Sequence, residues 1–230
     1  MAAPLFEDES AGHANMPSTA RHLQPLYAAQ PAARPTHAPG DFAAVGNFVC
    51  SLLATLGLEP GQLVVDVGCG SGWLAPQLAC FPRLRYLGTD VSNELLARVR
   101  GRTQRDDWLF ARTAGDAIPC ANDAADFVCL SSLFAHLLPQ DAIRYLTEAR
   151  RALQAGGDIV FPFFDFLLEG ETIAEWARAA GLRLSQIVSG YDAPAPLDEI
   201  FPWAAHGGFG PCRCLGQSVA VLSKPFPRIA

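Results

Sequence analysis

The sequence predicts a single α/β domain in which helices flank both faces of a mostly parallel, doubly wound sheet. From Gln62 onward, short apolar runs alternate with helix-length amphipathic stretches, a glycine-rich bend follows the first run, and aspartates end several runs. Repeated strand–helix–strand units place the strands in parallel and join them by right-handed crossovers. With 230 residues, 50% of them hydrophobic, the chain is long enough for one well-buried domain and too short for two full-sized ones.

The first half of the domain begins with a predicted helix from Asp41, which carries apolar residues at helical spacing: Phe42, Val45, Phe48, Val49 and Leu52. The aliphatic run Leu63–Val67 ends in glycines and is typical of a buried strand. A second strand is predicted to end at Asp90, and a third around Trp108–Ala111. Between them, Ser92 stands where a helix N-cap belongs, with Glu94 in the first turn and Leu95, Leu96 and Val99 on one face.

The second half continues the alternation with a strand over Asp126–Leu130. Pro139 and Asp141 open a helix that Gly156-Gly157 closes, and its predicted inner face is Ile143, Leu146, Ala149 and Leu153. Ile159-Val160-Phe161 resumes as strand. Thr172 and Glu175 form a capping box for a helix that Gly181 stops, with Ile173, Trp176, Ala177 and Ala180 facing inward. Two final strands are predicted near Leu182–Val188 and Gln217–Leu222.

Composition narrows the possible partners. The net charge is −6 with only 17 basic residues, and their one local concentration (Arg98, Arg100, Arg102 and Arg105) is typical of a solvated helix end, so no nucleic acid is expected. No apolar run is long enough to span a membrane, and the start Met1-Ala2-Ala3-Pro4 lacks the features of a secretory signal, so we expect a cytoplasmic protein. Seven cysteines indicate reduced thiols, and Cys212-x-Cys214 is a poor zinc spacing, so no metal is expected.

Two segments are predicted to lie outside the regular alternation. Residues 1–40 contain six prolines and ten alanines without periodicity, so we expect a disordered tail before a domain over 41–230. The Pro- and Gly-rich segment 189–215 is predicted to form a lid or acceptor-binding insertion because it concentrates aromatic residues and a histidine: Tyr191, Phe201, Trp203, His206 and Phe209.

The bend after the first strand, Asp66-Val67-Gly68-Cys69-Gly70-Ser71-Gly72, lets the backbone turn sharply and approach a ligand. Trp73 stands where a dinucleotide fingerprint needs its third glycine, which disfavours NAD or FAD. The carboxylate of Asp66 would repel a pyrophosphate and suits a positively charged ligand without phosphate. S-adenosylmethionine carries both an ammonium and a sulfonium group.

Two further aspartates extend this candidate site. A carboxylate at Asp90 can accept both hydroxyls of a ribose, and Asp116, after the third strand, can accept the exocyclic amine of an adenine. Each aspartate alone is typical of a turn or cap. Three at the ends of three successive strands predict a nucleoside-binding site.

These stretches resemble the class I methyltransferases, the type 11 kind in particular. The motifs that carry the resemblance are Val65–Gly72, Gly88-Thr89-Asp90-Val91-Ser92, Gly115-Asp116-Ala117-Ile118-Pro119, Ala125–Cys129, Phe134–Leu138, Glu148–Gly157 and Gly216–Leu222, within roughly residues 41–224. The resemblance implies a Rossmann-like, seven-stranded sheet with an antiparallel last strand and S-adenosylmethionine across its centre. Two departures are Ala155, where a proline is usual, and the large Trp73, which would narrow the cofactor channel.

The resemblance also implies the cofactor-binding residues. The methionine part would lie along Asp66, Gly68, Cys69, Gly70, Ser71 and Gly72, the ribose at Asp90 with Val91, and the adenine at Asp116 and Ala117, while Leu130, Ser131 and Ser132 would close over the cofactor.

Methyl transfer from a sulfonium is an in-line displacement, in which positioning of the reactants can contribute about 7–11 kcal/mol. His136 is the candidate base, because a near-neutral pKa suits proton removal; the alternative is that it packs between the fourth strand and the next helix. Asp165 is either a second polar group at the ligand edge or a solvated loop residue. Cys69 and Cys129 are interpreted as small packing groups.

The predicted function is therefore transfer of a methyl group from S-adenosylmethionine to an O or N atom of an unidentified acceptor. The acidic charge favours a small-molecule acceptor over a macromolecule. Two further alternatives stay open: a non-catalytic cofactor-binding partner of another methyltransferase, and an NAD(P)-dependent oxidoreductase. The oligomeric state does not follow from the sequence.

Overall fold

The computed structural model describes residues 39–113, 115–130, 139–164, 170–189 and 217–226. Its helices are α2 (Pro39–Thr55), α3 (Ala75–Leu78), α4 (Asn93–Thr103), α5 (Pro139–Ala152) and α6 (Gly170–Ala179). Its strands are β1 (Leu63–Val67), β2 (Arg85–Asp90), β3 (Leu109–Arg112), β4 (Ala125–Leu130), β5 (Leu153–Phe164), β6 (Arg183–Ser189) and β7 (Gln217–Ser223).

The described strands form one seven-stranded sheet in the order β3-β2-β1-β4-β5-β7-β6. The strands β1 to β5 pair in parallel, and β7 runs antiparallel to both β5 and β6. The strand order reverses between β1 and β4, the place where ligands bind in open α/β sheets. This arrangement confirms the predicted doubly wound, Rossmann-like fold, including its antiparallel last strand.

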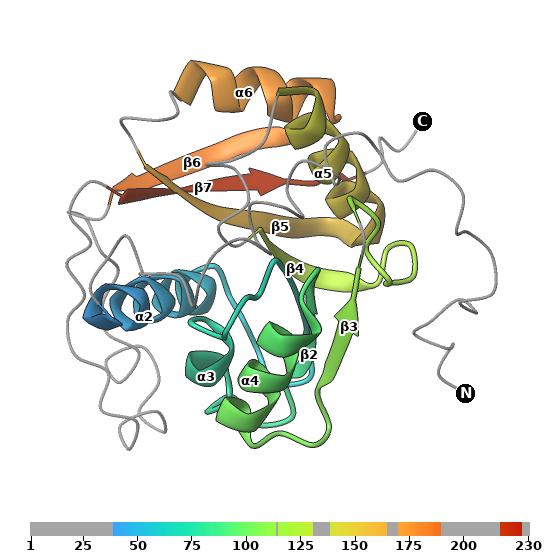
Figure 1. Ribbon diagram of the computed structural model, residues 1–230. Helices are drawn as coiled ribbons and strands as arrows, with labels where there is room; N and C mark the ends of the chain where they lie inside the picture. The colour runs from blue at the N-terminus through green and yellow to red at the C-terminus, as the bar shows by residue number, and fades with distance from the viewer. Residues whose placement is uncertain (1–38, 114, 131–138, 165–169, 190–216, 227–230) are drawn as a thin grey trace.

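Helices cover both faces of the sheet, as Figure 1 shows, with α5 and α6 on one face and α2, α3 and α4 on the other. Two buried clusters follow from the alternation of side chains along the strands. Val64 and Tyr86 pack with α2, α3 and α4, whereas Val65 and Leu87 pack with α5 and α6. Each strand of the centre is thus apolar on both sides, as the run Leu63–Val67 predicted.

Local signals predicted several boundaries correctly. The strand Leu63–Val67 has the predicted bounds, and the Ser92 side chain accepts the N–H of Leu95 at the start of α4. Gly181, with φ +71°, ends α6 as predicted: its N–H donates to the Arg178 carbonyl while that of Leu182 donates to the Ala177 carbonyl. This paired pattern is a Schellman motif, which favours glycine at the left-handed position.

Two predicted boundaries were wrong. The helix α5 ends at Ala152, and Leu153 and Gly156-Gly157 belong to β5, because residues near the chain's end pair with this segment. Lys224 Nζ donates to the carbonyls of Arg150 (3.0 Å) and Leu153 (2.6 Å), which draws the chain out of the helix. The helix α6 begins at Gly170, so Thr172 lies in its first turn rather than at its cap.

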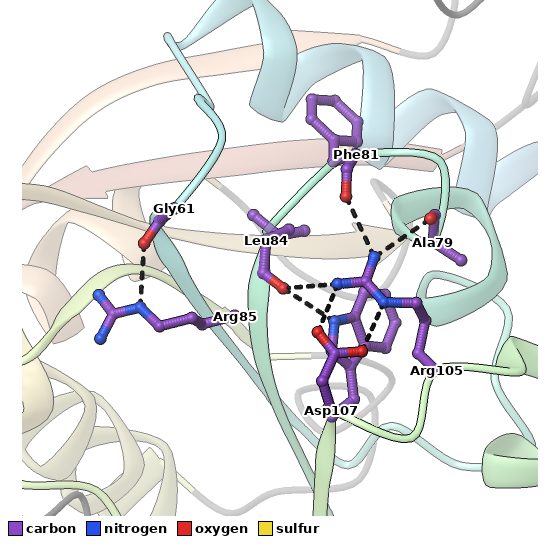
Figure 2. Close-up of polar contacts among 8 residues, drawn as sticks. Gly61, Ala79, Phe81, Leu84, Arg85, Arg105 and Asp107 are labelled. Atoms are coloured by element: carbon purple, nitrogen blue, oxygen red, sulfur yellow. Dashed lines mark hydrogen bonds and ion pairs between the residues drawn. The ribbon is translucent and has the colours of Figure 1, made fainter.

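Arg105 is not a solvated residue at the end of α4, contrary to the prediction. Its side chain is 17% exposed, and its guanidinium donates to the carbonyls of Ala79 (3.3 Å), Phe81 (3.1 Å) and Leu84 (3.0 Å). Figure 2 shows these bonds fanning out from the guanidinium, with Asp107 paired on its other side. The cluster lies at the amino ends of β2 and β3, the edge of the sheet opposite the predicted cofactor site.

Some predictions fall outside the described residues. They concern the tail up to residue 38, Ser131, Ser132, His136, Asp165, the pair Cys212 and Cys214, and segment 189–215 beyond Ser189. Within the described part of the chain, no helix combines the length and apolarity needed to cross a membrane.

Candidate functional site

The strand register gathers the predicted site residues at the carboxyl edge of the sheet. Val67 at the end of β1 pairs with Thr89 of β2 and with Leu130 of β4, and Asp90 pairs with Arg112 of β3. The ends of four adjacent strands therefore meet in one row. The bend Asp66–Gly72 leaves this row directly after β1.

The bend is fixed by backbone contacts to β2. The N–H groups of Gly68 and Cys69 both donate to the Thr89 carbonyl, at 2.8 and 2.9 Å. Gly68, Gly70 and Gly72 have φ values of +73°, +55° and +81°, in the left-handed region that favours glycine. A β-carbon at Gly70 would meet no atom closer than 3.9 Å. The backbone there is half-buried beside the exposed Ser71, so the bend presents main chain rather than side chains to a ligand.

Helices on two sides hold the end of the bend. A β-carbon on Gly72 would lie 2.4 Å from Val99 Cγ2, so α4 packs directly against this glycine. Arg102, also from α4, donates to the Ser71 carbonyl at 3.1 Å. On the other side, a β-carbon on Gly46 of α2 would lie 1.9 Å from the carbonyl oxygen of Trp73, whose half-buried indole packs against the core of this face. Gly46 was not singled out in the sequence, because a helical glycine carries no signal of the partner that it approaches.

Asp90 joins the bend to the following helix. One carboxylate oxygen accepts the N–H of Gly70 (3.0 Å) and the other accepts that of Ser92 (2.9 Å). Burial raises the pKa of this carboxyl above its ordinary value, while the N–H groups of Ser92, Gly70 and Val91 oppose that rise. An ionised carboxylate has about four acceptor positions, so Asp90 retains capacity for a ribose hydroxyl beside these N–H groups.

Asp66 lies beneath the bend rather than on its surface. Its side chain is buried, and the phenol of Tyr86 donates to Oδ2 at 2.7 Å. Tyr86 in turn stacks on Trp108, with ring centroids 4.5 Å apart, and burial beside Asp66 raises the pKa of the phenol well above its ordinary value. Tyr86 therefore stays protonated and holds one oxygen of Asp66. This partner could not be predicted, because a tyrosine at position 86 fits an ordinary buried strand.

Asp116 and Ala117 lie in the loop after β3, half-buried and exposed respectively. The loop rests on α5: Asp116 Oδ2 is 3.4 Å from Arg144 Nε, and the Tyr145 phenol donates to the Gly115 carbonyl at 3.1 Å. Neither partner was predicted, since nothing in the sequence says which face of α5 meets this loop. The third acid is thus brought to the same edge as the other two.

Other predicted residues take supporting positions. Val91 is half-buried, and its carbonyl accepts Arg112 Nε at 3.0 Å. Leu130 is fully buried at the end of β4. Cys69 and Cys129 are buried and free, and burial raises the pKa of both thiols, so they remain protonated, as the packing interpretation requires.

The polar groups at this edge fit a cationic nucleoside without phosphate. A glycine bend presents half-buried main chain at Gly70, and two half-buried carboxylates lie at the same edge, Asp90 at the end of β2 and Asp116 in the loop after β3. Within the described part of this edge, three arginines are already engaged: Arg144 pairs with Asp116 and Asp141, Arg102 donates to the Ser71 carbonyl, and Arg112 donates to the Val91 carbonyl.

Comparisons with known proteins agree with this geometry. Residues 65–161 match a family model described as a methyltransferase domain. An uncharacterized methyltransferase of Mycobacterium leprae (strain Br4923) is 29% identical over 185 residues, which cover 77% of this chain and 68% of the relative.

Two solved structures share the fold. One is a TehB-like S-adenosylmethionine-dependent methyltransferase from Corynebacterium glutamicum, with 18% identity and a TM-score of 0.57, covering 89% of this chain and 97% of that one. The other is CalO1, a methyltransferase of calicheamicin biosynthesis bound to S-adenosylhomocysteine, with 21% identity and a TM-score of 0.56, covering 79% of this chain and 54% of that one. The family match and the sheet order favour the methyltransferase over the oxidoreductase alternative. The match to the methyltransferase domain, the similar methyltransferase of Mycobacterium leprae and the shared fold all point to a class I S-adenosylmethionine-dependent methyltransferase, and they support S-adenosylmethionine as the cofactor.

Proposed function

We propose that the carboxyl edge described above is the cofactor site and that the enzyme methylates an O or N atom of a small-molecule acceptor. The observation that carries the site is the carboxylate of Asp90, which binds the N–H of Gly70 in the bend and that of Ser92 at the start of α4. One side chain thereby couples the surface for the methionine part to the acceptor for the ribose.

Each group at this edge has a proposed task. The main chain of Gly68, Cys69, Gly70, Ser71 and Gly72 lies along the methionine part, with Asp66 supporting the bend from below. Asp90 and Val91 hold the ribose, Asp116 and Ala117 the adenine, and Leu130 and Ser131 close the site from β4.

The chemistry rests on positioning. When bound, S-adenosylmethionine would supply an electrophilic methyl group for the acceptor's lone pair and a neutral thioether as the leaving group. The protein must align acceptor and sulfonium and exclude water, which contributes much of the rate. Where the acceptor loses a proton, His136 is the proposed base, and segment 189–215 is the proposed lid or acceptor-binding insertion.

A small acceptor is supported by charge and by one relative. The chain carries a net charge of −6, which disfavours nucleic acid because phosphates would be repelled. The structurally similar CalO1 is a methyltransferase of calicheamicin biosynthesis. Both observations favour a small molecule over a nucleic acid as the methyl acceptor.

Calorimetric titration with S-adenosylhomocysteine tests the site. We expect micromolar-range binding that falls at least about tenfold in Asp90→Ala, a loss of about 1.4 kcal/mol. Asp107→Ala is the matched control, because this aspartate lies at the opposite edge of the sheet, paired with Arg105. Equal affinity of wild type and Asp90→Ala would remove Asp90 from the site.

Turnover with a panel of small hydroxyl and amine compounds tests the reaction. We expect methylation of a member of the panel and a lower rate of methylation in His136→Ala. Raising the pH should recover part of that rate, because hydroxide can then take the proton in place of the missing base. Tight cofactor binding without turnover on any acceptor would instead favour the non-catalytic partner.

A further inference from the structure

The loop that carries Asp116 takes its shape from α5. The Glu148 carboxylate accepts the N–H of Ile118 at 3.1 Å, and Arg151 donates to the carbonyls of Ile118 (2.8 Å) and Cys120 (2.7 Å). Together with the bond from Tyr145 to Gly115, these contacts come from one face of the helix, at spacings of three residues. The helix therefore fixes the main chain on both sides of Asp116.

Arg144, on the same face, acts on the Asp116 side chain itself. Its Nε lies 3.4 Å from Asp116 Oδ2, while its Nη2 donates to Oδ1 of Asp141, one turn earlier on α5. The side chain of Asp141 is 3% exposed and that of Arg144 is 46% exposed. A buried carboxylate thus anchors a guanidinium whose other nitrogen reaches the loop.

We propose that Arg144 is a positioning residue that orients Asp116 and thereby sets the preference of the site for a 6-aminopurine. This inference rests on the proposed function, in which Asp116 faces the adenine. An ionised carboxylate only accepts hydrogen bonds. With Oδ2 held by Arg144, Oδ1 is left to accept an N–H from the exocyclic amine, and a purine without that donor gains nothing from it.

A contribution to stability is a poor explanation for this pair. Asp116 is 31% exposed and Arg144 is 46% exposed, and ion pairs between groups this open to water contribute little to folding. The planar guanidinium, held by Asp141 on one side, instead fixes a direction for its second contact. Orientation of the partner carboxylate is the effect that this geometry can supply.

The test compares two ligands by calorimetry on the full chain. They are S-adenosylhomocysteine and its analogue in which hydrogen replaces the 6-amino group of the purine. We expect wild type to prefer the amino compound by about tenfold, the worth of one hydrogen bond to a charged group. In Arg144→Met this preference should fall to about twofold or less, because only the affinity for the amino compound drops.

Two further variants separate positioning from folding. Arg144→Lys keeps the charge but loses the two-pronged contact, so its preference should lie between those of wild type and Arg144→Met. Arg150→Met is the matched control, since Arg150 is exposed on the same helix and donates to the Gly181 carbonyl instead. It should keep the wild-type preference. Thermal unfolding of each variant shows that it is folded.

The outcomes are distinct. Equal loss of affinity for both ligands in Arg144→Met would overturn the inference, because it would mean a general distortion of the loop. A wild-type protein that binds both ligands equally would also overturn it while leaving the cofactor site in place. Failure of wild type to bind S-adenosylhomocysteine at all would overturn the proposed function itself.

Discussion

The two edges of the sheet satisfy their polar groups in different ways, and at the amino edge several main-chain groups are bound by side chains. The Arg105 guanidinium donates hydrogen bonds to three carbonyl groups there (Figure 2). The carboxylate of Asp126 accepts the N–H of Leu63 and an N–H of the Gln154 amide, both at 2.7 Å. Trp108 Nε1 adds a bond to the Leu84 carbonyl at 2.9 Å. Donors and acceptors at this edge are matched to one another.

The carboxyl edge keeps acceptors near the surface instead. The carboxylates of Asp90 and Asp116 are half-buried, and the bend shows bare main chain at Gly70. Glycine gives this edge its shape at the cost of conformational entropy. The comparison indicates that one edge stabilises the fold, while the other is the edge proposed to bind the cofactor. Substitutions at the two edges should therefore separate changes in stability from changes in binding.

The largest expected effect is at Gly72, where both properties should change. Gly72→Ala places a β-carbon 2.4 Å from Val99 Cγ2 at a φ of +81°, and strain with overpacking should lower the free energy of unfolding by about 2–5 kcal/mol. Affinity for S-adenosylhomocysteine should fall with it, because the bend must shift. Urea unfolding and calorimetry measure the two quantities.

Gly101→Ala is the matched control for Gly72→Ala. Gly101 lies within α4, and a β-carbon there would meet no atom within 4 Å. The change should raise the free energy of unfolding by about 0.5–1 kcal/mol through helix propensity and leave binding unchanged. If Gly72→Ala changed stability and affinity no more than Gly101→Ala does, the tight contact between the bend and α4 would contribute to neither property.

The next effect is at the amino edge, where stability alone should change. Arg105→Met leaves the carbonyls of Ala79 and Phe81 without their donor, while the Leu84 carbonyl keeps Trp108. We expect a loss of about 2–3 kcal/mol in the free energy of unfolding. Affinity for S-adenosylhomocysteine should stay within about twofold, since distant sites act independently. A large drop in affinity would mean that the edges are coupled.

The local parts of this architecture could be predicted from sequence. The run Leu63–Val67, the cap at Ser92 and the stop at Gly181 depend on residues within a few positions, so their patterns are complete in the sequence. The alignment of acids at the carboxyl edge was also predictable, because parallel strands point their carboxyl ends the same way.

Contacts between distant elements could not be predicted. The end of α5 depends on Lys224, about seventy residues later in the chain, which binds the carbonyl of Leu153. Tyr86 meets Asp66, and Arg144 meets Asp116, only because of how strands and helices pack. A tyrosine in an apolar strand and an arginine on an amphipathic helix carry no mark of these partners.

The smallest expected effect is the response of the two edges to acid. At the carboxyl edge, burial raises the pKa of Asp90 in the folded protein. The contribution of this shift to the free energy of unfolding is therefore present below the pKa of the unfolded chain and is lost as the pH rises through the pKa of the folded protein. At the amino edge, the hydrogen bond from Arg105 lowers the pKa of Asp107 in the folded protein. The contribution of this shift to stability is therefore present above the pKa of the unfolded chain and is lost as the pH falls through the pKa of the folded protein.

The affinity for S-adenosylhomocysteine should depend on the ionisation of Asp90, because only the ionised carboxylate accepts hydrogen bonds from both main-chain N–H groups and from a ribose. Affinity for S-adenosylhomocysteine should therefore fall severalfold as pH is lowered toward the raised pKa of Asp90, a decline that starts above the ordinary aspartate range. Calorimetry across this range measures it. In Asp90→Asn the affinity should be lower and flat with pH, whereas Asp107→Asn should keep the wild-type decline. A decline that persisted in Asp90→Asn would assign the acid response to another group and remove the electrostatic distinction between the two edges.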